Sequence, residues 1–147
     1  MLVELPTPSG AKKVLIQKRR KPGTDYDGLW EIPQGRIKRG ESFLDAAQRE
    51  LKEETSMRLA SLDPAHGHVA DNILGFAVES FSPFMCVTDP GHDYVGIAVL
   101  VSAAGEPAAS EESGGHRWVD REEVVKLISS GLVFPLNVPL LKAYFRL

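Results

Sequence analysis

Residues Gly35–Met57 read G-R-I-K-R-G-E-S-F-L-D-A-A-Q-R-E-L-K-E-E-T-S-M. The centre of this stretch holds three carboxylates within five residues, those of Glu50, Glu53 and Glu54. On a helix these positions are i, i+3 and i+4, so the three side chains share one face, where they repel one another. A hard divalent cation such as Mg²⁺ or Mn²⁺ prefers carboxylate oxygens and would relieve that repulsion.

The same stretch has the pattern of an amphipathic helix. Ser42 is a suitable N-cap, with Asp45 three residues later, so the helix is predicted to run from about Phe43 to Thr55. A second stripe beside the carboxylates is apolar and able to pack in a core: Leu44, Ala47 and Leu51. A solvated acidic helix face is the competing interpretation of the carboxylates.

The spacing around the carboxylates resembles the Nudix box, G-x5-E-x7-R-E-U-x-E-E-x-G-U, in which U is a bulky apolar residue. The segment Trp30–Gln34 also resembles the strand and turn that precede the box. Ser56 stands where the family has its last Gly, and a Ser with a left-handed backbone costs on the order of 1 kcal/mol. The matching positions are Gly35, Glu41, Arg49, Glu50, Leu51, Glu53, Glu54 and Met57.

The resemblance implies one Nudix domain over residues 1–147, with an α/β fold in which a mixed β-sheet lies between helices as an α/β/α sandwich. It also implies an enzyme that uses Mg²⁺ or Mn²⁺ to hydrolyse the pyrophosphate bond of a nucleoside diphosphate linked to a group X. A Nudix-fold nucleotide-binding module without catalysis is the alternative from another class. In such a module we expect box carboxylates to be replaced, whereas all of them are present here.

The resemblance also assigns roles to residues of this chain. It implies that Arg49 and Glu41 orient the carboxylates, and that the general base is Glu54 or Glu112, with Glu111 in reserve. Glu112 is singled out because the two acidic residues precede a strand containing Trp118 in a loop that supplies a further carboxylate in several Nudix enzymes. The implied metal ligands are Glu50, Glu53, Glu54 and a main-chain carbonyl of Gln34 or Gly35.

The substrate is the least determined feature. The tail around Asn137 resembles the end of MutT-type nucleoside triphosphate pyrophosphohydrolases, in which an Asn reads a purine base, so a nucleoside triphosphate is preferred. A helix-capping Asn is the competing interpretation. The motif Trp-x-x-Pro-Gln-Gly before the box favours a dinucleoside polyphosphate or an RNA 5′ end as the substrate instead. The box alone also allows an ADP-sugar.

Two groups of basic residues are candidate phosphate contacts. One surrounds the predicted strand Val14–Arg19, where charge protecting an edge strand is the preferred explanation and Arg19 is the favoured exception by its family position. The other, with Arg36 as the candidate, follows Gly35; it either meets a phosphate or only offsets the acidic helix.

Composition narrows the class of protein. The chain has 147 residues and a net charge of −3, which argues against a general nucleic-acid binder. It has one cysteine, Cys86, and no apolar run of membrane-spanning length or signal peptide, so a cytoplasmic location is expected. We expect a small nucleotide substrate, no membrane and no stable nucleic-acid partner. A short strand Leu2–Leu5 at the edge of the sheet makes a homodimer plausible.

The remaining elements follow from periodicity and capping residues. Cys86 is expected in the core, and His66 and His68 are expected in a surface loop because they lack further ligands for zinc. The predicted elements are strands Arg58–Leu62, one or two between Ile73 and Val87, Tyr94–Ser102 and His116–Val119, and helices from Arg121 to about Ser130 and from Leu140 to about Phe145.

Overall fold

The computed structural model describes residues 1–5, 10–111 and 113–147. Its centre is a mixed sheet in the order β10-β2-β1-β9-β4, with β3 paired to β2. β1 and β9 run parallel, and every other pair in this sheet is antiparallel. The strands are β1 (Leu2–Leu5), β2 (Lys13–Arg19), β3 (Trp30–Glu31), β4 (Arg58–Leu62), β9 (Leu100–Ala104) and β10 (Ser113–Val119).

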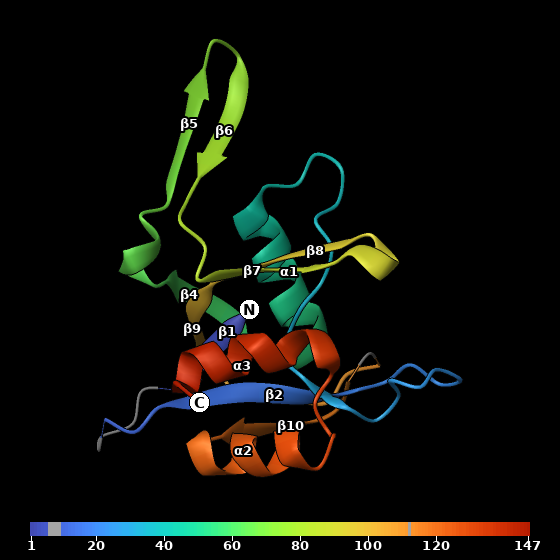
Figure 1. The fold of residues 1–147 in the computed structure, drawn as a ribbon. Coiled ribbons are helices and arrows are strands. Elements are labelled where there is room, and N and C mark those ends of the chain that lie inside the picture. The colour runs from blue at the N-terminus through green and yellow to red at the C-terminus, as the bar shows by residue number, and fades with distance from the viewer. Residues whose placement is uncertain (6–9, 112) are drawn as a thin grey trace.

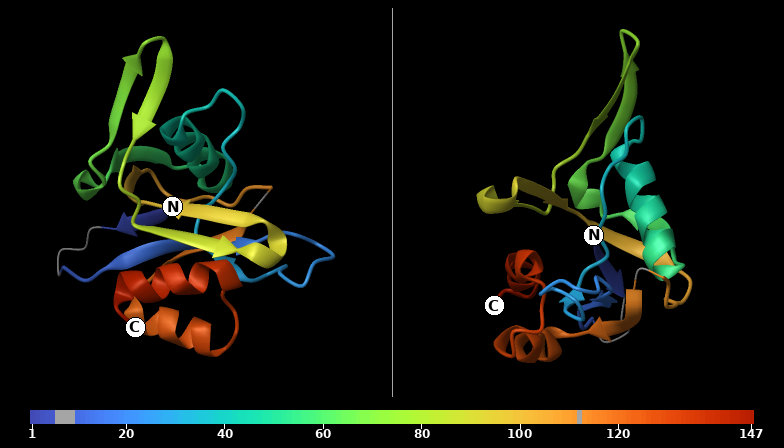
Figure 2. Two further views of the ribbon diagram at one scale, coloured as in Figure 1. Left: turned by 45° about the horizontal axis from the view of Figure 1, so that its top comes forward. Right: turned by 90° about the vertical axis from the view of Figure 1, so that its right-hand side faces the viewer.

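Helices cover both faces of the sheet (Figures 1 and 2). Helix α1 (Phe43–Thr55) lies on one face, and α2 (Arg121–Ser129) and α3 (Val138–Phe145) lie on the other. The predicted α/β/α sandwich with a mixed sheet is therefore confirmed. The bounds predicted for the acidic helix are those of α1, whereas α3 begins two residues earlier than expected.

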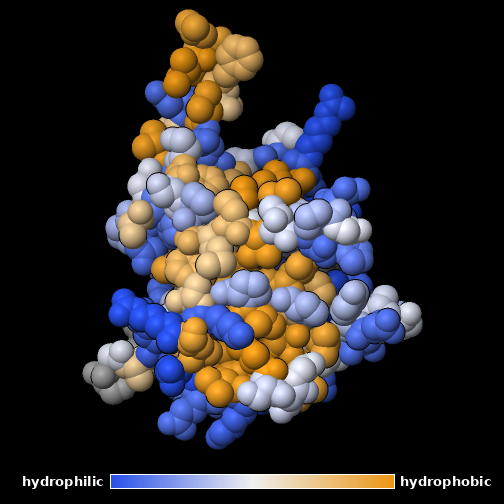
Figure 3. All heavy atoms as spheres, viewed as in Figure 1, coloured by the Kyte–Doolittle hydropathy of each residue, from blue (hydrophilic) through white to orange (hydrophobic). Residues whose placement is uncertain are grey.

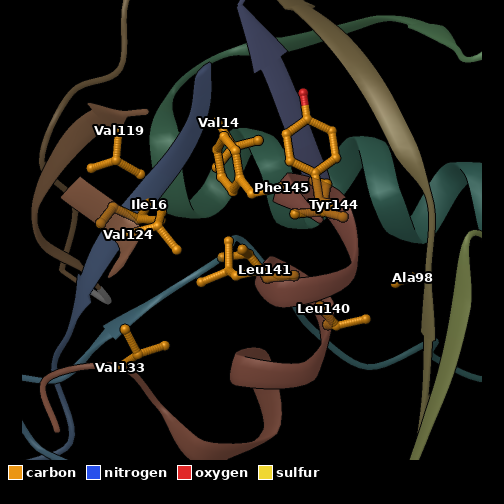
Figure 4. Packing of buried hydrophobic residues seen from close by; sticks show 12 residues of the cluster. Val14, Ile16, Ala98, Val119, Val124, Val133, Leu140, Leu141, Tyr144 and Phe145 are labelled. Atoms are coloured by element: carbon orange, nitrogen blue, oxygen red, sulfur yellow. The ribbon is translucent and has the colours of Figure 1, made fainter. Parts of the chain in front are cut away.

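Side chains along the central strands point alternately to the two faces of the sheet, so the core has two layers. In β2, Val14 and Ile16 pack against α2 and α3, while Leu15 between them packs with Leu51 of α1. Figure 4 shows the layer under α3, where Leu141 and Phe145 meet β2. Leu51 is fully buried against the sheet; next to it on α1, Glu54 is also buried, while the Glu53 side chain is 43% exposed on the outer side of the helix.

The ends of α1 follow the sequence-based expectation. The Ser42 hydroxyl accepts a hydrogen bond from the Asp45 amide at 3.1 Å. Ser56 adopts the left-handed conformation that Gly would favour, with φ at 62°, and its N–H donates to the Lys52 carbonyl at 2.9 Å. The Ser substitution therefore keeps the cap geometry at a local backbone cost.

Two hairpins lie outside the central sheet. One, β5 (Val69–Ile73) with β6 (Phe76–Ser80), projects away from the body; the other is β7 (Met85–Asp89) with β8 (Tyr94–Ala98). The predicted strand Tyr94–Ser102 is thus two strands: β8 pairs with β7, and β9 turns into the central sheet. Three short 3-10 helices, Pro64–His66, Pro90–His92 and Pro135–Asn137, complete the described elements.

Three expectations about exposure are wrong. β1 lies between β2 and β9, so it is not an edge strand and gives no reason for a homodimer. β2 is also internal, so its basic residues do not protect an edge. Cys86 is exposed on β7 rather than packed in the core.

Among the described helices, none is both long and apolar enough to cross a bilayer.

Candidate active site

Arg49 gathers the acidic residues at the exposed side of α1. Its Nε and Nη2 donate to the two Glu41 oxygens at 2.7 and 2.9 Å, and its Nη1 donates to Glu50 at 2.6 Å and Glu53 at 2.9 Å. Nη2 also donates to the Arg36 carbonyl at 2.9 Å, which ties α1 to the preceding loop. The bidentate pair with Arg49 lowers the pKa of Glu41 to about 2. Arg49 thus joins Glu41, Glu50 and Glu53 in one hydrogen-bonded network.

Glu50 lies directly against Gly35. A Cβ built on Gly35 would lie 1.8 Å from the Glu50 carboxyl carbon, so the carboxylate occupies the space that a side chain at position 35 would need. The Glu50 side chain is only 13% exposed. Glycine is therefore required here for a close approach between helix and loop rather than for an unusual backbone angle.

Glu54 points inward, beneath the loop. The Gln34 amide donates to Glu54 Oε2 at 2.9 Å, and the Gln34 side chain donates to buried Glu31 at 3.0 Å. The amide of Gln17 is fully buried beside Glu31 and Glu54, and its two polar atoms make no hydrogen bond of normal geometry. Arg19 donates to Glu31 from the adjacent strand. The site thus continues from exposed Glu53 into a buried polar layer.

Burial dominates the electrostatics of this inner layer. It raises the pKa of Glu54 to about 8, an effect that the Gln34 amide and Gln17 partly oppose. It also raises the pKa of Glu31, against the influence of Arg19. The described site therefore contains two buried carboxyls with raised pKa values, Glu31 and Glu54, beside the ion pairs that Arg49 makes.

The donor chemistry fits a hard divalent cation. All candidate ligands are oxygens. The Glu50 carboxylate occupies the space beside Gly35 that a side chain would fill, which we call the cradle at Gly35, and the main-chain carbonyls next to it are further oxygen donors. Within residues 1–5, 10–111 and 113–147, however, no three His, Cys, Asp or Glu side chains are gathered closely enough to hold a metal ion. The Glu50, Glu53 and Glu54 carboxylates are therefore not gathered around one point in this structure.

A cavity of about 530 Å³ opens beside these carboxylates. It is lined by α1 through Phe43 and Glu50, by the loop Gln34–Ile37, and by β8. Apolar side chains make most of the wall, while Arg36, His92 and Asp93 are charged or ionisable groups within it. A largely apolar cavity with a few polar groups beside an acidic cluster is suited to a small organic group carrying phosphates.

Two of the predicted substrate contacts have internal partners. Arg19 is paired with Glu31 and lies over the Phe134 ring at 4.5 Å. The Asn137 amide is 1% exposed; its Oδ1 accepts from the Ile32 amide at 2.9 Å and its Nδ2 donates to Gln34 at 3.3 Å. In this arrangement Asn137 braces the loop that carries Gln34 instead of facing the cavity. Arg36 does line the cavity.

Other candidates lie elsewhere. Glu112 lies outside the described residues, and Glu111 beside it is exposed. His66 is buried rather than in a surface loop: its Nδ1 pairs with the Ser82 carbonyl at 2.5 Å and its Nε2 accepts from the Leu100 amide at 2.8 Å. His68 pairs with Glu79 at 2.8 Å, so the two histidines have separate structural roles.

Sequence reasoning missed the groups beneath the site. Glu31 and Gln17 come from neighbouring strands β3 and β2, and Ser113 and His116 of β10 contact the Glu54 carbonyl at 3.0 and 3.1 Å. Gln17 could have been noticed as a polar residue that follows the apolar run Val14–Ile16 in the predicted strand. In the structure Gln17 is as fully buried as Ile16. For Ser113 and His116 the chain carries no such signal.

The raised pKa of Glu54 predicts the pH dependence of stability without metal. The folded state holds a proton that the unfolded chain loses above its ordinary value of 4.5, so the free energy of unfolding should fall as the pH rises from about 4.5 to about 8. In EDTA at pH 8, Glu54→Gln should raise the melting temperature by several degrees, since one pKa unit corresponds to about 1.4 kcal/mol. Glu53→Gln removes the same charge from an exposed position and should change little. Equal melting curves for the wild type and Glu54→Gln across this pH range would contradict the prediction.

Comparison with known proteins gives a consistent picture. The family model of the NUDIX domain matches residues 6–135. RNA pyrophosphohydrolase of Mesorhizobium japonicum is 42% identical over 65 residues, covering 39% of this chain and 38% of that protein. The m7GpppN-mRNA hydrolase NUDT17 of Xenopus laevis is 32% identical over 90 residues, covering 61% of this chain and 28% of that protein. The chain thus spans less than two fifths of the length of these relatives.

Solved structures agree on the fold. A possible asymmetric diadenosine tetraphosphate hydrolase from Jonesia denitrificans superposes with a TM-score of 0.67 at 18% sequence identity. The match covers 99% of this chain and 89% of that one. At this identity the likeness is one of architecture.

Proposed function

The chain belongs to the Nudix family, and we propose on that premise that it is a metal-dependent hydrolase of a pyrophosphate bond in a nucleoside diphosphate linked to X. The observation that supports this most directly is the position of Glu50. Its carboxylate fills the cradle at Gly35 and also lines the 530 Å³ cavity, so a cation held there would meet phosphates of a bound nucleotide. We take residues 1–147 as one domain and propose that this domain acts in the cytoplasm.

Mg²⁺ or Mn²⁺ would be held by Glu50, Glu53, Glu54 and a main-chain carbonyl of Gln34 or Gly35. When bound, such a cation neutralises phosphate oxygens and lowers the pKa of a coordinated water. The oxygen-only donor set and the exposed position of Glu53 support this assignment. Glu50 and Glu53 share the guanidinium of Arg49, which orients both carboxylates.

Glu54 is the described carboxyl best placed to hold a proton. It is buried, and one of its oxygens accepts a hydrogen bond from the Gln34 amide. Burial raises its pKa to about 8, so without metal it is protonated at neutral pH, and a bound cation would have to displace that proton before the carboxylate could act as a base. We propose it as the general base that receives the proton of the attacking water, with Glu112 as the alternative. In-line attack on one phosphorus then releases the other phosphate group.

For the group X we favour an RNA chain with a 5′-polyphosphate end. The two curated relatives named above are an RNA pyrophosphohydrolase and an mRNA cap hydrolase, which supports this class. Arg36, Lys38 and Arg39 are exposed on the loop after Gly35, where they can contact phosphates of a longer substrate. The net charge of −3 fits a transient substrate contact better than stable nucleic-acid binding.

A free nucleoside triphosphate is the second candidate, and a dinucleoside polyphosphate is the third. The triphosphate preference rests on the tail around Asn137, but both ends of that amide are engaged by Ile32 and Gln34. Reading a purine would require Asn137 to release them. The dinucleoside polyphosphate is suggested by the name of the Jonesia denitrificans neighbour, which is similar in fold.

The proposal is tested by product release in Mg²⁺ or Mn²⁺ across a panel of substrates. The panel contains 5′-triphosphate and capped RNA, nucleoside triphosphates including oxidised purines, diadenosine polyphosphates and ADP-ribose. We expect kcat/KM for one RNA end to exceed that for every free nucleotide by at least about 10-fold. A free nucleotide as the best substrate would reverse the ranking. Metal binding without turnover of any substrate would favour the binding-module alternative.

A further inference from the structure

The hairpin formed by β5 and β6 has one apolar face. Its register pairs Ile73 with Phe76, Asp71 with Val78, and Val69 with Ser80. Directly paired residues in an antiparallel ladder lie on the same side, and alternate residues along a strand lie on opposite sides. One side therefore carries four large apolar side chains and the carboxylate of Asp71. We call this side, together with Leu74 in the turn, the arm face: Val69, Ile73, Leu74, Phe76 and Val78.

The arm face is open to solvent in the single chain. Leu74 is 94% exposed and Phe76 is 72% exposed, and the other three side chains are between 39% and 57% exposed. The space-filling view in Figure 3 shows apolar side chains gathered over the projecting hairpin. An isolated two-stranded hairpin is marginally stable in water and normally needs a third strand or a packing surface. Within the described residues the arm face is left largely uncovered, so a further packing surface would stabilise the hairpin.

The turn of the arm uses an unfavourable residue. Leu74 and Gly75 are the two turn residues, with φ at 53° and 85°. This geometry favours Asn-Gly, and a left-handed Leu costs on the order of 1 kcal/mol. Because the Leu74 side chain is almost fully exposed, its packing does not stabilise the monomer and does not offset the backbone cost. Burial of Leu74 against a partner would offset it.

The root of the arm is held firmly. The Ser82 amide donates to the His66 carbonyl at 2.8 Å, and the His66 ring pairs with the Ser82 carbonyl, which closes the two strands at their base. On the side opposite the arm face, Glu79 accepts from the Phe43 amide at 2.6 Å and pairs with His68. The arm is therefore fixed to the first turn of α1 and presents a preorganised surface.

We propose that the arm face is the contact between two copies of this chain, packed face to face across a two-fold axis. From their exposures, the five side chains present on the order of 600 Å², at the upper end for an apolar patch on a monomer. Two copies would together remove about 1,200 Å² from water, the lower end of specific interfaces. Apart from Asp71 and Ser80 this side of the hairpin is apolar, and an apolar face can pack against a copy of itself, as a two-fold contact requires.

Charge argues against other occupants. Residues 69–80 contain Asp71 and Glu79 and no Lys or Arg. An anionic membrane or a nucleic acid would be repelled by this segment, because both need basic contacts. An uncharged lipid surface is the remaining competitor that the experiment has to separate.

The test is sedimentation equilibrium of the intact chain from about 1 to about 200 µM. The wild type should form a dimer. The double variant Leu74→Asn with Phe76→Thr should raise the dissociation constant of the dimer at least about 30-fold, because a large aromatic anchor is removed. Asn-Gly improves the turn and Thr suits a strand, so the variant arm remains folded as a monomer. Ala77→Thr on the opposite side of the same hairpin is the matched control and should dimerise as the wild type does.

Each result decides the proposal. A monomeric wild type at every concentration would overturn it, and binding of that monomer to phosphatidylcholine vesicles would assign the arm to lipid. A double variant that dimerises as tightly as the wild type would also overturn it, by placing the contact elsewhere. Loss of the dimer in the double variant alone, with unchanged circular dichroism, would establish the arm contact.

Discussion

Glu54→Gln and Glu53→Gln are each expected to lower kcat on the best substrate at least about 100-fold while the chain folds normally. The reasons differ between the two residues. Gln at position 54 can still accept the Gln34 amide, so the loop remains in place, but it cannot take up a proton. Gln at position 53 keeps its contact with Arg49 but loses the charge of the exposed carboxylate that we propose as a metal ligand.

Steady-state kinetics and Mn²⁺ binding by electron paramagnetic resonance separate these roles. A base acts in the chemical step, so loss of rate in Glu54→Gln with retained Mn²⁺ affinity would identify a base rather than a ligand. Glu122→Gln, in the exposed first turn of α2, is the control for a removed surface charge. Wild-type turnover in either box variant would refute the assignment for that residue.

The sequence predicted the bounds of α1 and its buried side well because local and long-range requirements coincide there. Ser42 and Ser56 fix the ends of α1, and Leu51 fixes the side that faces the sheet. Once these are set, helical geometry places Glu50, Glu53 and Glu54 on neighbouring positions of the helix surface, although the burial of Glu54 depends on the loop that covers it. The pairing of Arg49 with Glu53 follows from their i, i+4 spacing.

Features that depend on strand order were not predictable in the same way. Periodicity identified Leu2–Leu5 as a strand, but its position between β2 and β9 depends on pairing with residues about 100 positions away. The continuous apolar run from Tyr94 did not reveal the change of sheet at Val99. Asn137 illustrates the consequence for the site: its partners Ile32 and Gln34 come from a distant segment, so its bracing role emerges only in the fold.

Gly35→Ala is expected to lower kcat/KM at least about 100-fold, a loss comparable to removal of a ligand. The backbone at Gly35 lies outside the left-handed region, so Ala costs no conformational strain there. The added Cβ would instead lie 1.8 Å from the Glu50 carboxyl carbon and 2.2 Å from both its oxygens. Because this carboxylate is held by Arg49 at 2.6 Å, it cannot move without leaving the network that orients Glu53 as well.

Gly114→Ala is the matched control for this effect. Its backbone is also outside the left-handed region, but the nearest atoms to the added Cβ are at 3.6 Å, an ordinary contact distance. We expect Gly114→Ala to retain activity and Mn²⁺ affinity, and Gly35→Ala to lose both with little change in melting temperature, since Glu50 moves toward solvent. If Gly35→Ala instead binds Mn²⁺ and turns over substrate as the wild type does, the Glu50 carboxylate can act from another position. The approach of helix to loop at Gly35 would then be a matter of packing, and metal binding would have to be reassigned to Glu53 and Glu54.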